Sequence, residues 1–461
     1  MTSTLRNNLI LQTDSYKLSH AGAYPKDVKG MFSYIEARSK GDTIVPFGLQ
    51  MWIKKTLLTP ITKADIDEAE VFAAGHGEPF NRAGWEKVLN VYKGLLPVKI
   101  RAVPEGTRVP SGNVIVSVEC VDPDLFWLSS YLETSLLRGV WYPTTIASND
   151  YKAWRVIRRF AAESSDDLSL VPFTLHDFGG RGVSSGESAE VGGAAHLVYF
   201  MGSDTIEGVR AANFYYNSKM AAFSVPAAEH SIQCSYGPVA QRDYLEKMLD
   251  TYAKPGGIVS IVIDGYDVYR EAQVLCSLKD KIVASGARIV FRPDSGDALE
   301  VIPRLLQLQE LTFGSKLNSK GYKVINNVGI IQGDGIDLES MTAILEKVTD
   351  LGYSASNIVF GSGGALMQKV NRDTFKFAQK ASAIFRNGQW HDIYKDPVTD
   401  PGKRSKAGRL SLYRSELTGE LITMGVGETD AQWTDVMHTV YQNGELLNEQ
   451  TLDEIRARAQ A

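Results

Sequence analysis

Five aspartates stand at positions where short apolar segments of the chain end: Asp204, Asp264, Asp267, Asp294 and Asp334. Carboxylates that converge on one mouth can hold ribose hydroxyls, bind Mg²⁺ through water or stabilise a developing positive charge. An aspartate at such a place can equally cap a turn or a helix, and this alternative stays open for Asp267 and Asp334. Arg181 and Arg292 occupy similar positions and would balance the acidic charges.

Two glycine-rich loops indicate a site for phosphate. Gly333-Asp334-Gly335 and Gly361-Ser362-Gly363-Gly364 each follow an apolar segment. Glycines at strand ends let backbone N–H groups approach an anion closely, and the N-terminus of a following helix adds a favourable dipole. Either loop alone could be no more than a tight turn. Together, after the last two strands of the pattern, they favour phosphate binding.

His230 and Phe178 are further candidates for the site. On its spacing alone, His230 is expected to be a hydrogen-bonded structural residue and not a catalyst, and the seven histidines show no spacing typical of a zinc site. Phe178 has polar neighbours at the end of a predicted strand. It could belong to the core, or it could stack on a flat heteroaromatic substrate.

The elements that must position these residues alternate between short apolar segments and helical patterns. Strands are predicted at 173–175, 197–201, 223–225, 259–263, 288–291, 328–331 and 357–360, and a helix over 338–348 with Asp337 as its N-cap. Such alternation predicts a parallel sheet. Seven units in succession favour an α/β barrel, closed or distorted, with its active site at the carboxyl ends of the strands.

Both ends of the chain have a mixed pattern. Strands are predicted at 98–102 and 114–118, and helices at 64–73 and 85–92. A chain of 461 residues is expected to form more than one domain. We therefore predict a mixed α+β module from residues 1–149 and 386–461, and the barrel from residues 150–385.

Composition excludes several classes of protein. With 44% hydrophobic residues, 22% charged residues and a net charge of −5, the chain is not expected to bind nucleic acid through its overall charge. Its three cysteines are scattered, which excludes a disulfide framework and fits a reducing cytoplasm. No apolar run approaches the roughly 20 residues of a membrane-spanning helix. We expect a soluble, cytoplasmic protein.

Motifs along nearly the whole chain resemble the nicotinamide phosphoribosyltransferase family: TDSYK (13–17), FGLQ (47–50), AVPEG (102–106), HDFGGRGVSS (176–185), SVPAAEH (224–230), RPDSG (292–296), IQGDG (331–335), FGSGG (360–364) and KDP…KRSKAGRLSL (395–412). The resemblance implies a type II phosphoribosyltransferase, in which an α/β barrel packs on a mixed module. It also implies a pentosyltransferase of NAD biosynthesis, which converts nicotinamide and phosphoribosyl pyrophosphate to nicotinamide mononucleotide and pyrophosphate. The expected assembly is a homodimer with shared active sites.

The same resemblance implies roles for individual residues. Phe178 and Tyr16 of the partner subunit would stack on the two faces of the pyridine ring, with Asp204 at the carboxamide and Arg292 beside the ring. The catalytic group would be His230, Asp264 and Asp294. Both aspartates would serve the ribose hydroxyls and Mg²⁺–pyrophosphate, and His230 resembles a histidine that ATP phosphorylates, so ATP is expected as a stimulating co-substrate. The phosphoribosyl and pyrophosphate group would comprise Arg38, Arg181, Ser260, Gly333, Asp334, Gly363, Gly364, Arg372, Lys380 and Lys395. Of these, Arg38, Arg372, Lys380 and Lys395 would come from the partner subunit.

Three alternative functions remain at this point. A nicotinate phosphoribosyltransferase would have the same architecture and differ in how it reads the carboxyl group. A non-catalytic ligand sensor would tolerate loss of the charged residues, which this chain keeps. An unrelated barrel enzyme acting on a sugar phosphate would explain the glycine loops, but it would not explain Tyr16 or His230.

Overall fold

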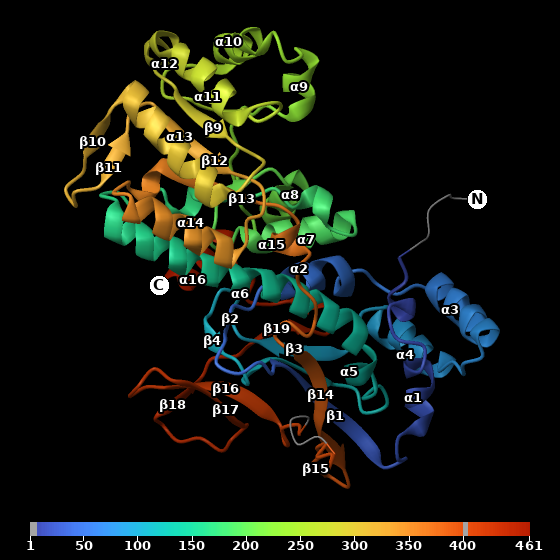
Figure 1. Cartoon of the computed structure of the whole chain (residues 1–461). Helices are drawn as coiled ribbons and strands as arrows, with labels where there is room; N and C mark the ends of the chain where they lie inside the picture. The colour runs from blue at the N-terminus through green and yellow to red at the C-terminus, as the bar shows by residue number, and fades with distance from the viewer. Residues whose placement is uncertain (1–6, 400–403) are drawn as a thin grey trace. The chain divides into compact units, whose positions relative to one another are not determined.

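The structure is a computed structural model that describes residues 7–399 and 404–461. The chain forms two compact units (Figure 1). The first comprises Met1–Ser148, Tyr215–Asn217 and Asn371–Ala461, and the second comprises Asn149–Phe214 and Ser218–Val370. Each unit is built around a sheet of its own. Within the described ranges, no helix is both long enough and apolar enough to cross a membrane.

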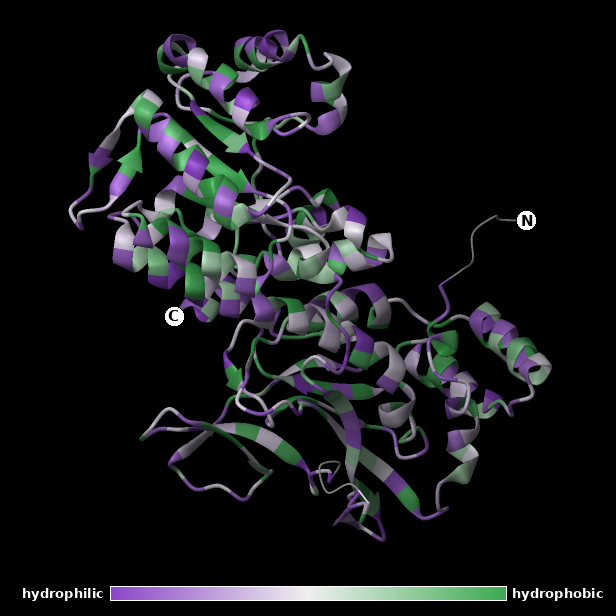
Figure 2. Ribbon diagram, viewed as in Figure 1, coloured by the Kyte–Doolittle hydropathy of each residue, from purple (hydrophilic) through white to green (hydrophobic). Residues whose placement is uncertain are grey.

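The second unit contains a parallel sheet of six strands. Their spatial order is β7 (Gly202–Ser203), β6 (Leu175–Asp177), β13 (Ile358–Ser362), β12 (Val328–Gln332), β9 (Arg288–Arg292) and β8 (Ile258–Val262). Every neighbouring pair is parallel, so the carboxyl ends of all six strands meet along one edge. The strands are mostly buried and hydrophobic, as Figure 2 shows, because helices cover a parallel sheet.

Helices connect these strands. Between β8 and β12 they are α11 (Val268–Ser277), α12 (Lys279–Ser285) and α13 (Ala298–Phe313), and α14 (Leu338–Asp350) leads to β13. Asp337 caps α14 and Asp267 caps α11, as their side chains accept hydrogen bonds from the first backbone N–H groups. The unit also contains α7 (Gly186–His196), α8 (Ile206–Tyr215), α9 (His230–Ser235), α10 (Gln241–Tyr252), α15 (Gly364–Met367) and the hairpin of β10 (Ser315–Leu317) and β11 (Lys323–Ile325).

The segment from Phe223 to Ala227 reaches both edges of this sheet. Phe223 forms an isolated bridge with Gly202 of β7, and Ala227 forms one with Ser260 of β8. Pro226 has no N–H and cannot donate to a strand ladder, which explains why the segment forms single bridges and no regular strand. The fold-class prediction is confirmed: the parallel sheet is a half-barrel, and this irregular segment replaces the predicted strand at 223–225.

The predicted strand at 197–201 is wrong. Helix α7 ends at His196, and the backbone N–H groups of Leu197 and Val198 bond to the carbonyls of Ala194 and Ala195. The apolar run is a buried turn at the end of the helix, and the strand follows only at 202–203. A short apolar run cannot distinguish a buried strand from a buried helical turn. The strand predicted at 173–175 is likewise displaced, because a 3₁₀ turn over Val171–Phe173 precedes β6.

The first unit contains an antiparallel sheet that combines both ends of the chain. Its order is β15 (Gln389–Asp392), β14 (Phe377–Arg386), β1 (Val28–Ala37), β5 (Val114–Cys120), β3 (Val98–Ala102), β19 (His438–Gln442) and β20 (Glu445–Leu446). Because β14 pairs with β1, the second unit ends at Val370 and not at the expected residue 385. The expected boundary at 149/150 lies inside one helix, α6 (Glu133–Ser164).

Helices and small sheets complete the first unit. The helices include α1 (Lys17–Ala23), α2 (Leu49–Trp52), α3 (Lys63–His76), α4 (Arg82–Tyr92), α5 (Leu128–Tyr131) and α16 (Leu452–Gln460). The small sheets are β2 (Thr43–Ile44) with β4 (Val109–Pro110), and β16 (Leu410–Ser415) with β17 (Leu421–Gly425) and β18 (Trp433–Asp435).

Two of the motifs in this unit are structural. The Glu105 carboxylate, in the AVPEG motif, accepts a hydrogen bond of 2.8 Å from the backbone N–H of Gln50 in the FGLQ motif. The Gln50 amide donates in turn to the carbonyls of Tyr215 and Gln450, each at 2.9 Å. Burial raises the pKa of Glu105. These bonds join four distant parts of the sequence within one core, which accounts for both motifs without a role in chemistry.

Candidate active site

Loops at the carboxyl edge of the parallel sheet form a pocket of about 410 Å³. Its lining residues follow β6, β7 and β9, three strands that end along the same edge. They are Phe178, Gly180, Arg181, Asp204, Thr205, Glu207 and Arg292. Four residues that were predicted for the ring or for phosphate, namely Phe178, Arg181, Asp204 and Arg292, therefore lie in one cavity.

Arg292 connects this pocket to the two predicted catalytic aspartates. Its guanidinium lies 5.6 Å from the centre of the Phe178 ring and forms an ion pair of 3.0 Å with Asp294. The backbone N–H of Asp294 donates to the Asp264 carboxylate at 3.0 Å. The other oxygen of Asp264 lies 2.9 Å from Nε2 of His230. The structure therefore places the three predicted catalytic residues in one continuous chain of polar contacts. This chain begins at the pocket lined by Phe178, Asp204 and Arg292, which we call the ring pocket.

The contact with Asp264 determines which nitrogen of His230 is free. Asp264 is almost fully buried, with 2% of its side chain exposed, whereas 46% of the His230 side chain is exposed. Because Nε2 faces the carboxylate, Nδ1 is the nitrogen available to an incoming group. A histidine held in this way can act as a nucleophile through Nδ1.

Asp204 is held by a residue that the sequence analysis did not single out. The hydroxyl of Ser224 donates to Oδ1 of Asp204 at 2.5 Å. Ser224 lies in the segment that bridges the two edges of the half-barrel, directly before Val225 and Pro226. The bond orients the carboxylate and leaves Oδ2 for a donor on a ligand. The signal for this contact was present in the SVPAAEH motif, but the partner of Ser224 depends on the curvature of the sheet.

Gly361 makes room for the Phe178 ring, and Gly333 makes room for the Asp294 carboxylate. A Cβ added to Gly361 would lie 2.0 Å from Cε2 of that ring, far inside van der Waals contact. A Cβ on Gly333 would lie 2.9 Å from Oδ1 of Asp294 and 3.7 Å from Cε2 of Phe178. Both glycines belong to loops that were predicted to approach phosphate. Their steric functions, Gly361 toward Phe178 and Gly333 toward Asp294, could not be read from spacing in the sequence.

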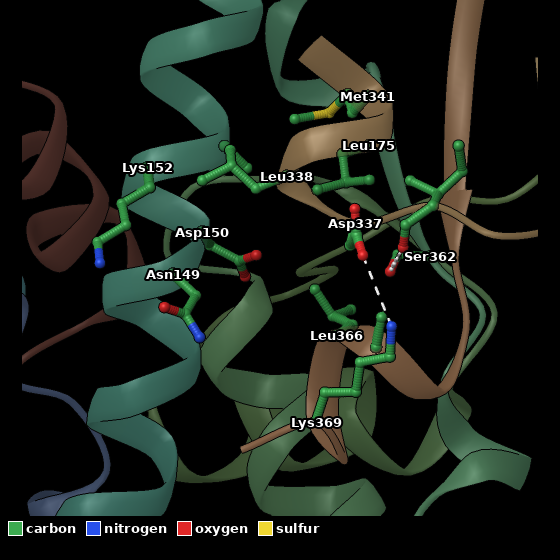
Figure 3. Close-up of a pocket in the computed structure, with 13 residues that line it drawn as sticks. Asn149, Asp150, Lys152, Leu175, Asp337, Leu338, Met341, Ser362, Leu366 and Lys369 are labelled. Atoms are coloured by element: carbon green, nitrogen blue, oxygen red, sulfur yellow. Dashed lines mark hydrogen bonds and ion pairs between the residues drawn. The ribbon is translucent and has the colours of Figure 1, made fainter. Parts of the chain in front are cut away.

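The two glycine-rich loops are also tied to each other. Ser362 is buried, and its hydroxyl donates to the Ile336 carbonyl at 3.0 Å. Lys369 and Asp337 form an ion pair of 3.5 Å beside this bond (Figure 3). The cavity drawn there, of about 230 Å³, is lined by residues other than the predicted site group. Gly363 and Gly364 have open space where a side chain would lie, and Gly364 begins α15.

Asp334 and Ser260 have environments that differ from the rest of the predicted group. The Asp334 side chain is exposed, and its carbonyl accepts a bond of 3.0 Å from the Gln332 amide. Since Asp337 caps α14, Asp334 is not its cap. Ser260 lies in β8 and lines a separate, mostly apolar cavity of about 580 Å³ within the half-barrel. His176 also lines that cavity, and burial lowers its pKa.

The remaining predicted residues lie in the first unit. Tyr16 is 53% exposed, and His20 packs against its edge with ring centres 4.8 Å apart. Lys380 is partly buried in β14, and Arg38 directly follows β1, its partner strand. Burial first, and then the positive charges of Arg38, Lys395 and Arg372, lower the pKa of Lys380, while Glu133 opposes them. Three other cations thus act on Lys380, while Arg38 and Arg372 also form ion pairs of 2.8 Å with Glu36 and 3.1 Å with Asp373. Residues 400–403 of the neighbouring motif lie outside the described part of the chain.

Known proteins resemble this chain over its whole length. Residues 173–445 match the nicotinate phosphoribosyltransferase (NAPRTase) family, and residues 8–100 match the nicotinamide phosphoribosyltransferase N-terminal domain. A protein of Xanthomonas campestris named nicotinamide phosphoribosyltransferase is 48% identical over 99% of this chain and 98% of its own length. One of the same name from Acinetobacter baylyi is 32% identical over 99% and 97%.

Solved structures share the fold at low sequence identity. A nicotinate-nucleotide pyrophosphorylase from Pyrococcus furiosus superposes with a TM-score of 0.61 at 18% identity, covering 100% of this chain and 97% of its own. Human nicotinic acid phosphoribosyltransferase superposes with a TM-score of 0.58 at 17% identity, covering 98% and 93%. Since both family models match and two relatives align over nearly their full length, the chain belongs to the nicotinamide phosphoribosyltransferase family of pentosyltransferases.

Proposed function

We propose that this enzyme transfers the 5-phosphoribosyl group from phosphoribosyl pyrophosphate to nicotinamide, giving nicotinamide mononucleotide and pyrophosphate in NAD salvage. The observation that carries the proposal is the ring pocket, where Phe178, Asp204 and Arg292 lie together. An aromatic face, a carboxylate acceptor and a cation suit a flat heteroaromatic ring with a carboxamide. The three cysteines are free, which fits the cytoplasm as the place of this reaction.

Binding of nicotinamide would orient its ring nitrogen, which is the nucleophile of the transfer reaction. Phe178 would stack on one face of the pyridine, and Tyr16 of the partner subunit would cover the other. Asp204, held by Ser224, would accept the hydrogen bond of the carboxamide NH₂. Two aromatic faces fix the plane of the ring at small entropic cost, so that the ring nitrogen points at C1 of the ribose.

Phosphate groups would bind at the glycine loops and at the cations. The backbone of Gly333, Asp334, Gly363 and Gly364, with Arg181 nearby, would hold the 5′-phosphate. Arg38, Arg372, Lys380 and Lys395 of the partner subunit would meet the pyrophosphate, which would relieve the repulsion that lowers the pKa of Lys380. Ser260 would contribute only from the inner cavity.

Asp264 and Asp294 would bind the ribose hydroxyls and the Mg²⁺–pyrophosphate. Within the described residues there is no group of three or more His, Cys, Asp or Glu side chains that could hold a metal. The two aspartates suit an ion that takes most of its ligands from pyrophosphate and water. Bound Mg²⁺ would supply positive charge for the leaving group. Displacement at C1 needs no protein nucleophile, so the chain acts by alignment and charge stabilisation.

His230 would couple ATP to this reaction. Nδ1 would attack the terminal phosphorus of ATP, the bond to ADP would break, and Asp264 would stabilise the proton on Nε2. The phosphohistidine would then be hydrolysed in each cycle. The exposure of His230 and its contact with a buried carboxylate support this role.

The histidine proposal predicts a selective loss. His230→Ala should abolish both ATP hydrolysis and the stimulation of synthesis by ATP, while slower basal synthesis remains measurable. His76→Ala, at the end of α3, serves as the control and should keep ATP hydrolysis and the stimulation of synthesis by ATP. If His230→Ala hydrolyses ATP as fast as the wild type, the histidine has a structural role only.

Shared sites in a homodimer predict complementation between damaged subunits. Tyr16→Ala and Asp294→Ala subunits, each inactive alone, should recover about a quarter of wild-type activity when mixed and exchanged, since half of the dimers carry one intact site. Mixing Tyr16→Ala with Arg372→Ala is the control. Both residues would act in the active site of the partner subunit, so neither site of the mixed dimer would be intact. Equal activity in the two mixtures would contradict sharing.

One assay tests the proposed function directly. Purified protein is incubated with phosphoribosyl pyrophosphate, Mg²⁺ and either nicotinamide or nicotinate, with and without ATP. Formation of nicotinamide mononucleotide is expected, with ATP raising its rate. Exclusive use of nicotinate would instead identify a nicotinate phosphoribosyltransferase, and no product from either ring would reject the reaction.

A further inference from the structure

A cluster of buried ionisable groups lies beneath the ring pocket and has no part in the proposed chemistry. His196, at the end of α7, is fully buried, and its Nδ1 lies 2.9 Å from the carboxylate of Asp150 on α6. Figure 3 shows Asp150 on the α6 side of the small cavity. Burial opposes a positive charge on His196, but Asp150 and Asp177 raise its pKa above the usual value. Asp177 is likewise fully buried.

Asp177 bonds to both loops that carry the ring contacts. It is the last residue of β6, immediately before Phe178. One carboxylate oxygen accepts the backbone N–H of Gly179 at 2.7 Å, directly after Phe178. The other faces the hydroxyl of Ser203 at 3.4 Å, and the Asp177 carbonyl accepts the N–H of Asp204 at 2.9 Å.

We propose that Asp177 is a positioning residue, which fixes Phe178 and Asp204 relative to each other from beneath the pocket. The inference rests on the proposed function, because it assigns a purpose to the geometry of the two ring contacts. Phe178 and Asp204 follow adjacent strands, β6 and β7, and β7 has only two residues. So short a pairing gives the Asp204 loop few backbone bonds to β6, among them the bond from the Asp204 N–H to the Asp177 carbonyl. The Asp177 side chain adds a bond to Gly179, directly after Phe178, and a longer one to Ser203, directly before Asp204.

The cost of burying this carboxylate supports a specific use for it. A buried charge without partners is strongly unfavourable, and an apolar residue would fill the same space without that cost. Here the carboxylate has the Gly179 N–H, the Ser203 hydroxyl and the nearby His196 as compensation. Packing is also tight: a Cβ on Gly179 would lie 3.2 Å from Oδ1, and one on Gly193 would lie 3.4 Å from Oδ2.

Replacement of Asp177 should affect the ring substrate selectively. In Asp177→Ala, KM for nicotinamide should rise about tenfold and the preference for nicotinamide over nicotinate should fall about tenfold, the loss expected for one charge-assisted bond. KM for phosphoribosyl pyrophosphate should change less, by no more than about threefold, since only Arg181 among the proposed phosphate contacts shares the loop after β6. Asp177→Asn keeps an acceptor for the Gly179 N–H. In this variant, KM for nicotinamide and the preference for nicotinamide over nicotinate should return most of the way to their wild-type values. Asp250→Asn, on the surface of α10, is the control.

The outcomes separate the inference from the proposed function. If Asp177→Ala folds and lowers kcat with both KM values and the ring preference unchanged, or if it behaves like Asp250→Asn, the inference is overturned. If Asp177→Ala does not fold, Ser203→Ala and Ser203→Thr decide together. Ser203→Ala removes the hydroxyl that donates to Asp177 and accepts the Thr205 N–H, whereas Ser203→Thr keeps it. A rise of about threefold in nicotinamide KM that occurs in Ser203→Ala alone supports the role, and no rise overturns it. Wild-type protein that makes no nicotinamide mononucleotide would reject the proposed function itself.

Discussion

Gly361→Ala is expected to lower kcat/KM for nicotinamide at least about a hundredfold, because a displacement of about 1 Å near the reacting atoms can cost that much. The added methyl would lie 2.0 Å from Cε2 and 2.2 Å from Cδ2 of Phe178, so the ring must leave its place. Gly361 lies in β13, whose backbone is held on both sides by β12 and β6. The strand cannot yield, and the aromatic wall of the pocket is lost.

The control for this substitution is Gly186→Ala. Gly186 begins α7, and nothing lies within 4 Å of a Cβ added there. Both variants are compared by thermal unfolding and by steady-state kinetics with nicotinamide. A folded Gly361→Ala protein with kcat/KM within about threefold of Gly186→Ala would show that the Phe178 ring does not form the binding wall.

Asp204→Ser is expected to remove most of the preference for nicotinamide over nicotinate. In the wild type the Asp204 carboxylate would accept the NH₂ of the amide, but it would repel a second carboxylate and offer it no donor. Asp204 is exposed in the free protein, and a bound ring would cover it. Leaving a covered group unpaired costs about 1–3 kcal/mol, and like charges add to this, so the wild-type preference should be at least roughly a hundredfold. In the variant, kcat/KM for nicotinamide should fall, and the ratio of kcat/KM for nicotinamide to that for nicotinate should become smaller. The measurement is kcat/KM for both substrates in both proteins.

Glu207→Gln is the matched control, since Glu207 also lines the ring pocket. It should leave the ratio of the two substrates near the wild-type value. If Asp204→Ser lowers both activities in parallel, Asp204 only stabilises the turn after β7. Ser224→Ala should shift the ratio in the same direction as Asp204→Ser but less far, because it loosens the carboxylate without removing it.

Several features could be predicted because they depend on local chemistry. Strands β8, β9, β12 and β13 carry consecutive apolar residues that only a doubly covered sheet can bury, and polar residues follow each of them. Asp337 and Asp267 were recognisable as residues that favour the start of a helix. Since parallel strands bring their carboxyl ends to one edge, Phe178, Asp204 and Arg292 could be expected near one another.

Other features required the folded chain. The run at 197–201 is as apolar as a strand, and only its place after α7 makes it a buried turn. The sequence of the late strand β14 would suit the sheet of either unit. Its pairing with β1 assigns it to the first unit. Local sequence determines which segments are buried, but it does not contain the partner against which each segment is buried.

The sequence by itself determined the parallel sheet of an α/β barrel type, the residue types of the site and the family to which the chain belongs. Only the tertiary structure decided that Gly361 makes room for Phe178, that Ser224 donates to Asp204, and that Asp177 bonds to both Gly179 and Asp204. The physical reason is the separation in sequence over which each kind of interaction acts. Hydrophobic periodicity and capping act between neighbours in sequence, whereas a steric fit or a hydrogen bond of about 3 Å depends on how distant strands curve together.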